Sequence, residues 1–123
     1  MNIRELLDSG RITLSFEVFP PKADADFEPI REAVGAISAL RPDFMSVTYG
    51  ASGGTSKNTV RIASYLQNHC GTAALAHLSC VSSTRQEVAG MLDELRENRI
   101  ENILALRGDI PEQGAFPLPG SYQ

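Results

Sequence analysis

The 123-residue sequence has few cysteines, no surplus of positive charge and no long apolar run. Its two cysteines, Cys70 and Cys80, are too few for a disulfide framework and lack the C-x-x-C spacing of a metal site. The formal net charge of −4 provides no basic surface for nucleic acid or an anionic membrane. No apolar stretch approaches the roughly 20 residues of a membrane span, and the N-terminus lacks a signal peptide's apolar region. We therefore expect a cytoplasmic protein with reduced thiols that binds no nucleic acid, membrane or metal.

The length and composition are those of one soluble globular domain. Apolar residues make up 42% of the chain and charged residues 21%, and 123 residues suffice for a small core. A complete eight-unit (β/α) barrel typically takes about 250 residues, so this sequence is too short for one.

Four short apolar runs recur along the chain at a spacing of about 30 residues, the length of one βαβ step. They occupy residues 12–19, 43–49, 73–80 and 102–106, and each is predicted to be a strand. A leading helix is predicted over residues 2–8, and one helix between each pair of successive strands. This order predicts an α/β fold: a parallel (β/α) barrel of the TIM type, here only its first four strands. We expect the sheet to be covered on both faces.

The three intervening helices are predicted from apolar residues that recur every three or four positions. Asp26 is the expected N-cap of the first helix, and Thr84 and Glu87 form a T-x-x-E capping box for the third. The second is expected over residues 57–70. The expected buried stripes are Phe27, Ile30, Val34, Ile37 and Leu40; Val60, Ala63, Leu66 and Cys70; and Val88, Met91, Leu92 and Leu95.

Each predicted strand ends in polar residues suited to chemistry, and the carboxyl ends of parallel strands meet at one rim. These residues are Glu17; Thr48, Tyr49 and Gly50; His77; and Arg107, Gly108 and Asp109. Glu17 and Asp109 would give the rim two carboxylates in different surroundings, as divided acid and electrostatic roles require. The sequence therefore predicts that Glu17, His77 and Asp109 converge on one mouth of a curved sheet.

Each candidate also has a purely structural interpretation, and the pattern leaves both open. A carboxylate between Phe16 and Phe19 is costly unless it is paired or functional, but Glu17 could simply reach water or an arginine. His77 could be a satisfied core histidine, and Asp109 could cap a turn. The glycine-rich loop at residues 50–55 could be an ordinary βα turn.

Four segments resemble the methylenetetrahydrofolate reductase family, in family order and with family-like spacing across nearly the whole chain. They are S-F-E-V-F-P-P-K (15–22), D-F-M-S-V-T-Y-G-A (43–51), H-L-S-C (77–80) and N-I-L-A-L-R-G-D (102–109). The third departs slightly, since the family usually has threonine at Ser79, but the hydroxyl is kept. The resemblance implies a flavin-dependent (β/α)8 barrel that reduces 5,10-methylenetetrahydrofolate to 5-methyltetrahydrofolate, with NADH or NADPH as donor and FAD as carrier.

The resemblance also implies roles for individual residues. Glu17 resembles the general acid that protonates the folate nitrogen as the five-membered ring opens, and Asp109 resembles the carboxylate beside flavin and folate. The implied FAD-binding set is Thr48, Tyr49, Ala51, His77, Arg107, Gly108, Asp109 and Tyr122. The implied setting is one-carbon metabolism and methionine supply.

Pattern and resemblance together predict that residues 1–123 are the N-terminal part of such a reductase domain, truncated after four of its strands. The isolated chain is not expected to turn over. Because the first and fourth strands would have unpaired edges, the expected partner is a second copy or the missing barrel half. Two alternatives remain: a non-catalytic half-barrel that assembles with another chain, and a half-barrel enzyme for a phosphorylated substrate.

Overall fold

Within residues 2–49, 56–81 and 83–108, which the computed structural model describes, four parallel strands form one sheet in chain order. They are β1 (Ser15–Val18), β2 (Phe44–Val47), β3 (Ala74–Ser79) and β4 (Asn102–Leu106). The predicted strand at 102–106 has the expected bounds, and the other three are shorter. The first loses the most because Ile12 and Leu14, 94% and 52% exposed, lie outside the pairing with β2.

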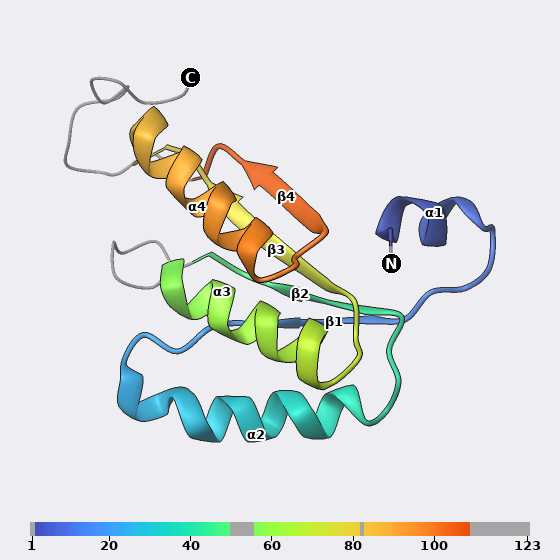
Figure 1. Cartoon of the computed structure of the whole chain (residues 1–123). Coiled ribbons are helices and arrows are strands. Elements are labelled where there is room, and N and C mark those ends of the chain that lie inside the picture. The colour runs from blue at the N-terminus through green and yellow to red at the C-terminus, as the bar shows by residue number, and fades with distance from the viewer. Residues whose placement is uncertain (1, 50–55, 82, 109–123) are drawn as a thin grey trace.

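The same ranges contain the helices α1 (Ile3–Asp8), α2 (Phe27–Ser38), α3 (Ser56–Ser64) and α4 (Arg85–Glu97). A 3-10 turn, η1 (Asp24–Asp26), leads into α2, and a π-helical turn, η2 (Tyr65–His69), extends α3. Helices α2, α3 and α4 lie along one face of the sheet (Figure 1). The short α1 is fixed near the start of β4, where the Ile3 N–H donates to Asn102 Oδ1 at 3.0 Å. The alternating α/β order with a leading helix is confirmed.

Alternate residues of each strand point to opposite faces of the sheet. One face, the helix face, packs against α2, α3 and α4; the other is called the open face. The helix-face residues Met45, Val47, Ala74 and Ala76 are fully buried, with Val34, Leu66 and Leu95 in the same apolar cluster. The open face carries Glu17, Ser46, His77, Leu104 and Leu106.

The prediction that both faces are covered is wrong for the described residues. Burial in β3 alternates strictly between buried and half-buried positions, and in β4 all residues after Asn102 are exposed. The apolar runs of the sequence are nearly continuous, but only every second residue of the inner strands is packed against a helix. The open face is therefore the side on which polar residues of the strands meet.

The helix boundaries follow from local hydrogen bonds. The Thr84 capping box is confirmed: Thr84 Oγ1 accepts from the Glu87 N–H at 3.2 Å, and Glu87 Oε2 accepts from the Thr84 N–H at 3.3 Å. Asp26 occupies the N-cap of α2 as predicted, but its side chain makes no capping bond. Instead, the preceding 3-10 turn η1 carries the chain into the helix.

Two details of the predicted helices are wrong. Helix α2 ends at Ser38 and Arg41 adopts a φ of 58°, so Leu40 lies beyond the helix and is 68% exposed. Leu92 is 37% exposed on α4. The helix predicted over 57–70 is confirmed in extent, since α3 and η2 together span 56–69. Its last turn is π-helical from Tyr65, and the Cys70 N–H donates to the Tyr65 carbonyl at 3.0 Å. No helix of the described residues is long and apolar enough to cross a membrane.

Candidate functional site

Glu17 and His77, predicted to lie on one rim, meet on the open face of the sheet. Glu17 of β1 is in register with Ser46 of β2, and His77 lies two residues beyond the partner of Ser46 on β3. His77 Nε2 is 3.8 Å from Glu17 Oε1, and the Ser46 hydroxyl donates to the same oxygen at 3.4 Å. The predicted convergence is confirmed for these two residues. Asp109, its third member, lies outside the described residues.

The Glu17 side chain is half-exposed, with 50% of its surface accessible. The two phenylalanines beside it do not bury it, because Phe16 points to the helix face and Phe19 is 70% exposed. Of the structural interpretations, Glu17 does reach water, but the nitrogen nearest its carboxylate belongs to a histidine rather than an arginine. An accessible carboxyl beside a hydroxyl and an imidazole is suited to proton transfer.

His77 is the more enclosed partner, with its side chain 12% exposed. Its ring is not confined to an apolar core, because Nε2 faces the Glu17 carboxylate. Along the sheet it is paired in register with Leu104 of β4, which is 40% exposed. The polar part of the open face is thus bordered by apolar side chains on the β4 side.

Thr48 and Tyr49 follow β2 at the carboxyl edge of the sheet. The Thr48 N–H donates to the Val18 carbonyl at 3.0 Å, which extends the pairing between β1 and β2 by one residue. The Tyr49 hydroxyl contacts Met91 Sδ of α4 at 2.9 Å, so its ring reaches toward the helix layer. Ala51 lies outside the described residues.

Arg107 and Gly108 follow β4 at the same edge. The Arg107 carbonyl accepts from the Val81 N–H at 2.8 Å and from the Ser79 hydroxyl at 3.3 Å. Gly108 has a φ of +87°, and a Cβ there would lie 2.0 Å from Ser79 Oγ. The glycine is therefore required by backbone conformation and by close approach to β3. Tyr122 lies outside the described residues.

A family model described as methylenetetrahydrofolate reductase matches residues 2–118 of this chain. The chain belongs to the methylenetetrahydrofolate reductase family.

Individual relatives of the methylenetetrahydrofolate reductase family match most of this chain. It is similar to the 5,10-methylenetetrahydrofolate reductase of Pectobacterium carotovorum subsp. carotovorum (37% identity; 88% of this chain, 36% of the relative). The enzyme of that name from Escherichia coli strain K12 is 35% identical, with the same coverage of 88% and 36%. Methylenetetrahydrofolate reductase (NADH) 1 of Arabidopsis thaliana is 36% identical (89% and 18%). The chain thus spans about a third of the bacterial relatives and about a fifth of the plant relative.

Three buried polar residues position the rim. None of them was predicted from the sequence. Ser46 contacts Glu17, as described above. Asn58 Nδ2 donates to the Pro21 carbonyl at 2.9 Å, and Thr59 Oγ1 donates to the Thr48 carbonyl at 2.9 Å. Both α3 residues are 2% exposed. A polar residue inside an apolar strand could have singled out Ser46, but nothing in the spacing marks Asn58 or Thr59.

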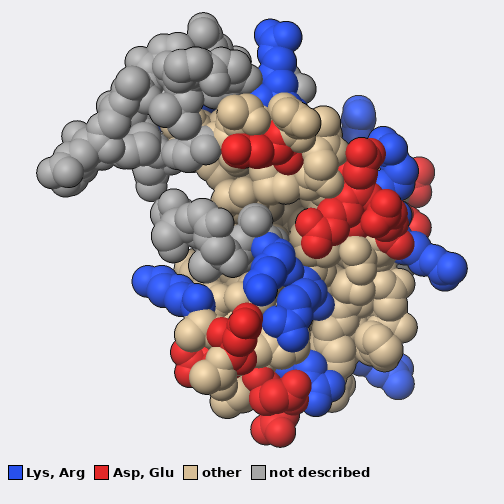
Figure 2. Space-filling model, turned by 60° about the vertical axis from the view of Figure 1, so that its left-hand side comes forward, with Lys and Arg blue, Asp and Glu red and all other residues tan. Residues whose placement is uncertain are grey.

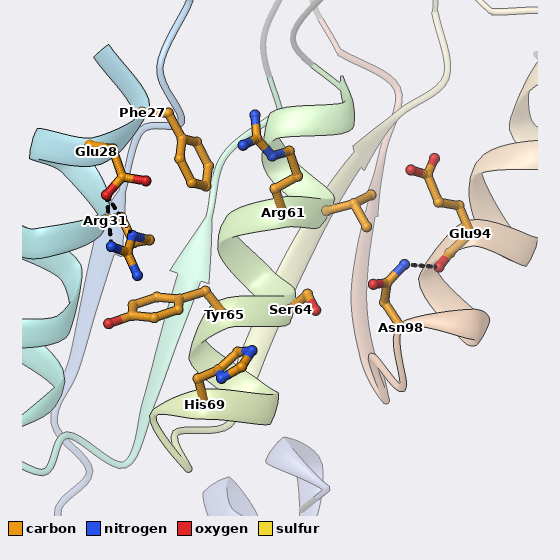
Figure 3. A pocket seen from close by; sticks show the side chains of 10 residues that line it. Phe27, Glu28, Arg31, Arg61, Ser64, Tyr65, His69, Glu94 and Asn98 are labelled. Carbon is orange, nitrogen blue, oxygen red and sulfur yellow. Dashed lines mark hydrogen bonds and ion pairs between the residues drawn. The ribbon is translucent and has the colours of Figure 1, made fainter. Parts of the chain in front are cut away.

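A separate groove of about 510 Å³ lies on the helical side, between α2, α3 and α4. Figure 3 shows Arg31 beside Glu28, Arg61 against Phe27, and Tyr65 above His69. The Arg61 guanidinium lies 3.7 Å from the centre of the Phe27 ring, and Arg31 Nη2 lies 2.7 Å from Glu28 Oε2. Charges of both signs alternate over the visible surface (Figure 2). Since the groove's arginines are already occupied by these partners, the open face remains the candidate site.

Proposed function

We propose that this chain contributes to the reduction of 5,10-methylenetetrahydrofolate to 5-methyltetrahydrofolate by NADH or NADPH through FAD. The single observation that carries the proposal is the meeting of Glu17, Ser46 and His77 on the open face of a chain from this family. The plant relative is named for NADH, which supports a nicotinamide donor. We assign the reaction to cytoplasmic one-carbon metabolism and methionine supply.

Glu17 is the general acid in this proposal. Its proton passes to a folate nitrogen as the carbon–nitrogen bond of the five-membered ring breaks, and the bonding electron pair stays on that nitrogen. The carbon is left as a cationic iminium and Glu17 as a carboxylate. The half-exposed position of Glu17 supports this role, because the proton must be within reach of a bound substrate.

The residues at the rim fit a flavin. Arg107 offers a cation at the end of β4, where it and Leu106 also line the hollow beside α4. The turn at Gly108 brings backbone close to the edge of β3, and Leu104 and Leu106 present apolar surface, each 40% exposed. Apolar side chains with a few polar groups among them suit a planar aromatic ring. We propose Thr48, Tyr49, Ala51, His77, Arg107, Gly108, Asp109 and Tyr122 as the residues that hold FAD. A bound flavin would supply hydride transfer from the nicotinamide to the folate carbon.

Asp109 is proposed as the second carboxylate of the site. A negative charge beside the reacting carbon would stabilise the cationic iminium, and beside the flavin it would favour hydride donation. This role differs from that of Glu17, which must give up a proton.

The rest of the proposed barrel would pack on the β4 side of the sheet. An apolar hollow of about 470 Å³ lies there between α4 and β4, lined by residues that include Val88, Leu92, Ile103 and Ala105. Leu92 and Ile103 are 37% and 38% exposed, and β4 is the last strand of the described sheet. We propose that further βα units, or a second copy, cover this surface and complete the (β/α)8 domain.

Flavin binding tests the proposal directly. FAD fluorescence would be titrated with the chain and with His77→Ala and Arg107→Ala, and Arg31→Ala on the outer groove serves as the matched control. Loss of a charged hydrogen bond is worth about 1.5–3 kcal/mol, so each rim variant should weaken binding about tenfold or more. The control should bind as the parent does.

Absence of FAD binding, or equal weakening by all three variants, would contradict the flavin site. A turnover assay with NADH or NADPH and methylenetetrahydrofolate completes the test. The 123-residue chain should be inactive, because the proposal assigns the remaining contacts to further βα units. Measurable turnover would refute that assignment.

A further inference from the structure

The two polar neighbours of Glu17 approach the same carboxyl oxygen. Ser46 Oγ is 3.4 Å from Oε1, and His77 Nε2 is 3.8 Å from Oε1. Among the described residues, no hydrogen bond or ion pair reaches Oε2. The carboxyl group is therefore asymmetric: Oε1 has two polar neighbours, and Oε2 has none among these residues, on a side chain that is 50% exposed.

Ser46 has little freedom to point elsewhere. It is 9% exposed, and buried hydroxyls are almost always hydrogen-bonded. Glu17 Oε1 is the acceptor that the structure gives it. His77 Nε2 lies beyond hydrogen-bond distance but within ion-pair distance, and such contacts often shorten when a site is filled.

A protonated carboxyl group carries its proton on one oxygen, and its other oxygen acts only as an acceptor. We propose that Ser46 and His77 are positioning residues that keep Oε1 of Glu17 as the acceptor, so that the acid proton is held on Oε2. This inference rests on the proposed role of Glu17 as the general acid. The proton then leaves Oε2 for the folate nitrogen, and the resulting carboxylate keeps both neighbours at Oε1.

The competing arrangement places the proton on Oε1, from which it would be donated to an unprotonated Nε2 of His77. In that arrangement the proton points into the sheet, and Oε2 is the carbonyl oxygen. The two arrangements differ in which oxygen forms the C=O bond. That difference is visible in the carbonyl stretching band, whose frequency falls as the carbonyl oxygen accepts more hydrogen bonds.

The experiment is an acid-induced infrared difference spectrum of the 123-residue chain. The band of Glu17 is isolated by subtracting the spectrum of Glu17→Gln. The proposal predicts a carbonyl stretching band of Glu17 at low wavenumber, which shifts to higher wavenumber in Ser46→Ala and in His77→Phe. Ser46→Thr keeps the hydroxyl and should therefore leave the band at its original wavenumber. Ser64→Ala removes a hydroxyl that accepts from Asn68 on the helical side at 3.1 Å, and it should leave the band unchanged.

A Glu17 band that neither Ser46→Ala nor His77→Phe moves would overturn the proposal. Nitrogen-15 NMR provides a second readout on the same samples. Neutral His77 should show a protonated, pyrrole-type Nε2, with His69 in η2 as the internal reference; an unprotonated Nε2 would also overturn the proposal. Both readouts are independent of FAD and folate. Failure of flavin binding or turnover therefore tests the proposed function, and the band position tests the proton assignment.

Discussion

The two faces of the sheet are made by alternate residues of the same four strands, yet they have opposite properties. On the helix face, Met45, Val47, Ala74 and Ala76 are 0% exposed. On the open face, Glu17 is half-exposed and lies among a serine, a histidine and exposed leucines. Because successive strand residues alternate in direction, a single residue step separates a position that stabilises the fold from one that can do chemistry.

The buried layer on the helix side also holds the partly exposed site in its geometry. The rim loops are tied to the buried layer by Asn58 and Thr59, whose side chains hold the Pro21 and Thr48 carbonyls. Stability and positioning are thus supplied from the helix side, while the open face is left accessible. If this division is correct, equivalent substitutions on the two faces should have unequal effects.

The largest difference is expected between two leucines. Leu66 is 0% exposed in the core, so Leu66→Ala should lower the free energy of unfolding by about 2–5 kcal/mol. Leu104 is 40% exposed on the open face, so Leu104→Ala should cost under about 1 kcal/mol. Urea unfolding followed by circular dichroism measures both. Equal losses would show that the open face is also packed.

The next effect is at the rim turn. Gly108→Ala places a Cβ 2.0 Å from Ser79 Oγ and requires an L-residue at a φ of +87°. The left-handed conformation alone costs about 1–2 kcal/mol, and the clash adds to it. In the double variant with Ser79→Ala, part of the loss should be recovered, because the nearest contact is removed. No recovery in urea unfolding would mean that backbone conformation accounts for the whole loss.

A smaller effect is expected where α3 holds the end of β2. Thr59→Val keeps the shape of the side chain but removes the hydroxyl that donates to the Thr48 carbonyl at 2.9 Å. The free energy of unfolding should fall by about 1 kcal/mol, and amide exchange should become faster around Thr48. Thr59→Ser is the matched control. It should retain most of the free energy of unfolding and most of the protection from amide exchange around Thr48. Equal exchange in the two variants would exclude the hydroxyl as the cause.

Much of the fold and part of the candidate site could be predicted from the sequence, because the spacing of apolar residues indicates strands and helices. The four strands, the capping box at Thr84 and the convergence of Glu17 with His77 all follow from spacing and strand order. The open face could not be predicted from apolar runs, since a continuous run does not say which alternate residues a helix covers. The π-helical turn at Tyr65 and the hydrogen bonds of Asn58 and Thr59 leave no periodic signal in the sequence.

The smallest expected effect is at the opposite edge of the sheet, where Asp43 joins the segments that precede β1 and β2. Its carboxylate accepts from the Leu14 N–H at 2.8 Å and pairs with Arg11 at 2.5 Å. The hydrogen bond from the Leu14 N–H, and to a smaller extent that from the Arg11 guanidinium, lowers the pKa of Asp43 below its ordinary value. Because the ionised form is favoured in the folded state, this stabilisation is present above the unfolded-state pKa and is lost as the pH falls through the lowered pKa.

Asp43→Asn should therefore reduce the free energy of unfolding at neutral pH, and the difference from the parent should shrink as the solution becomes acidic. Urea unfolding at a series of pH values measures this difference in the free energy of unfolding. Added salt should reduce the part of the difference that comes from the ion pair with Arg11. Asp93→Asn is the matched control: Asp93 contacts Arg96 at 3.2 Å on an exposed turn of α4, where ion pairs contribute little. A difference that grows in acid would contradict the assignment. A difference that shrinks there would show that the Asp43 carboxylate stabilises the fold in its ionised form.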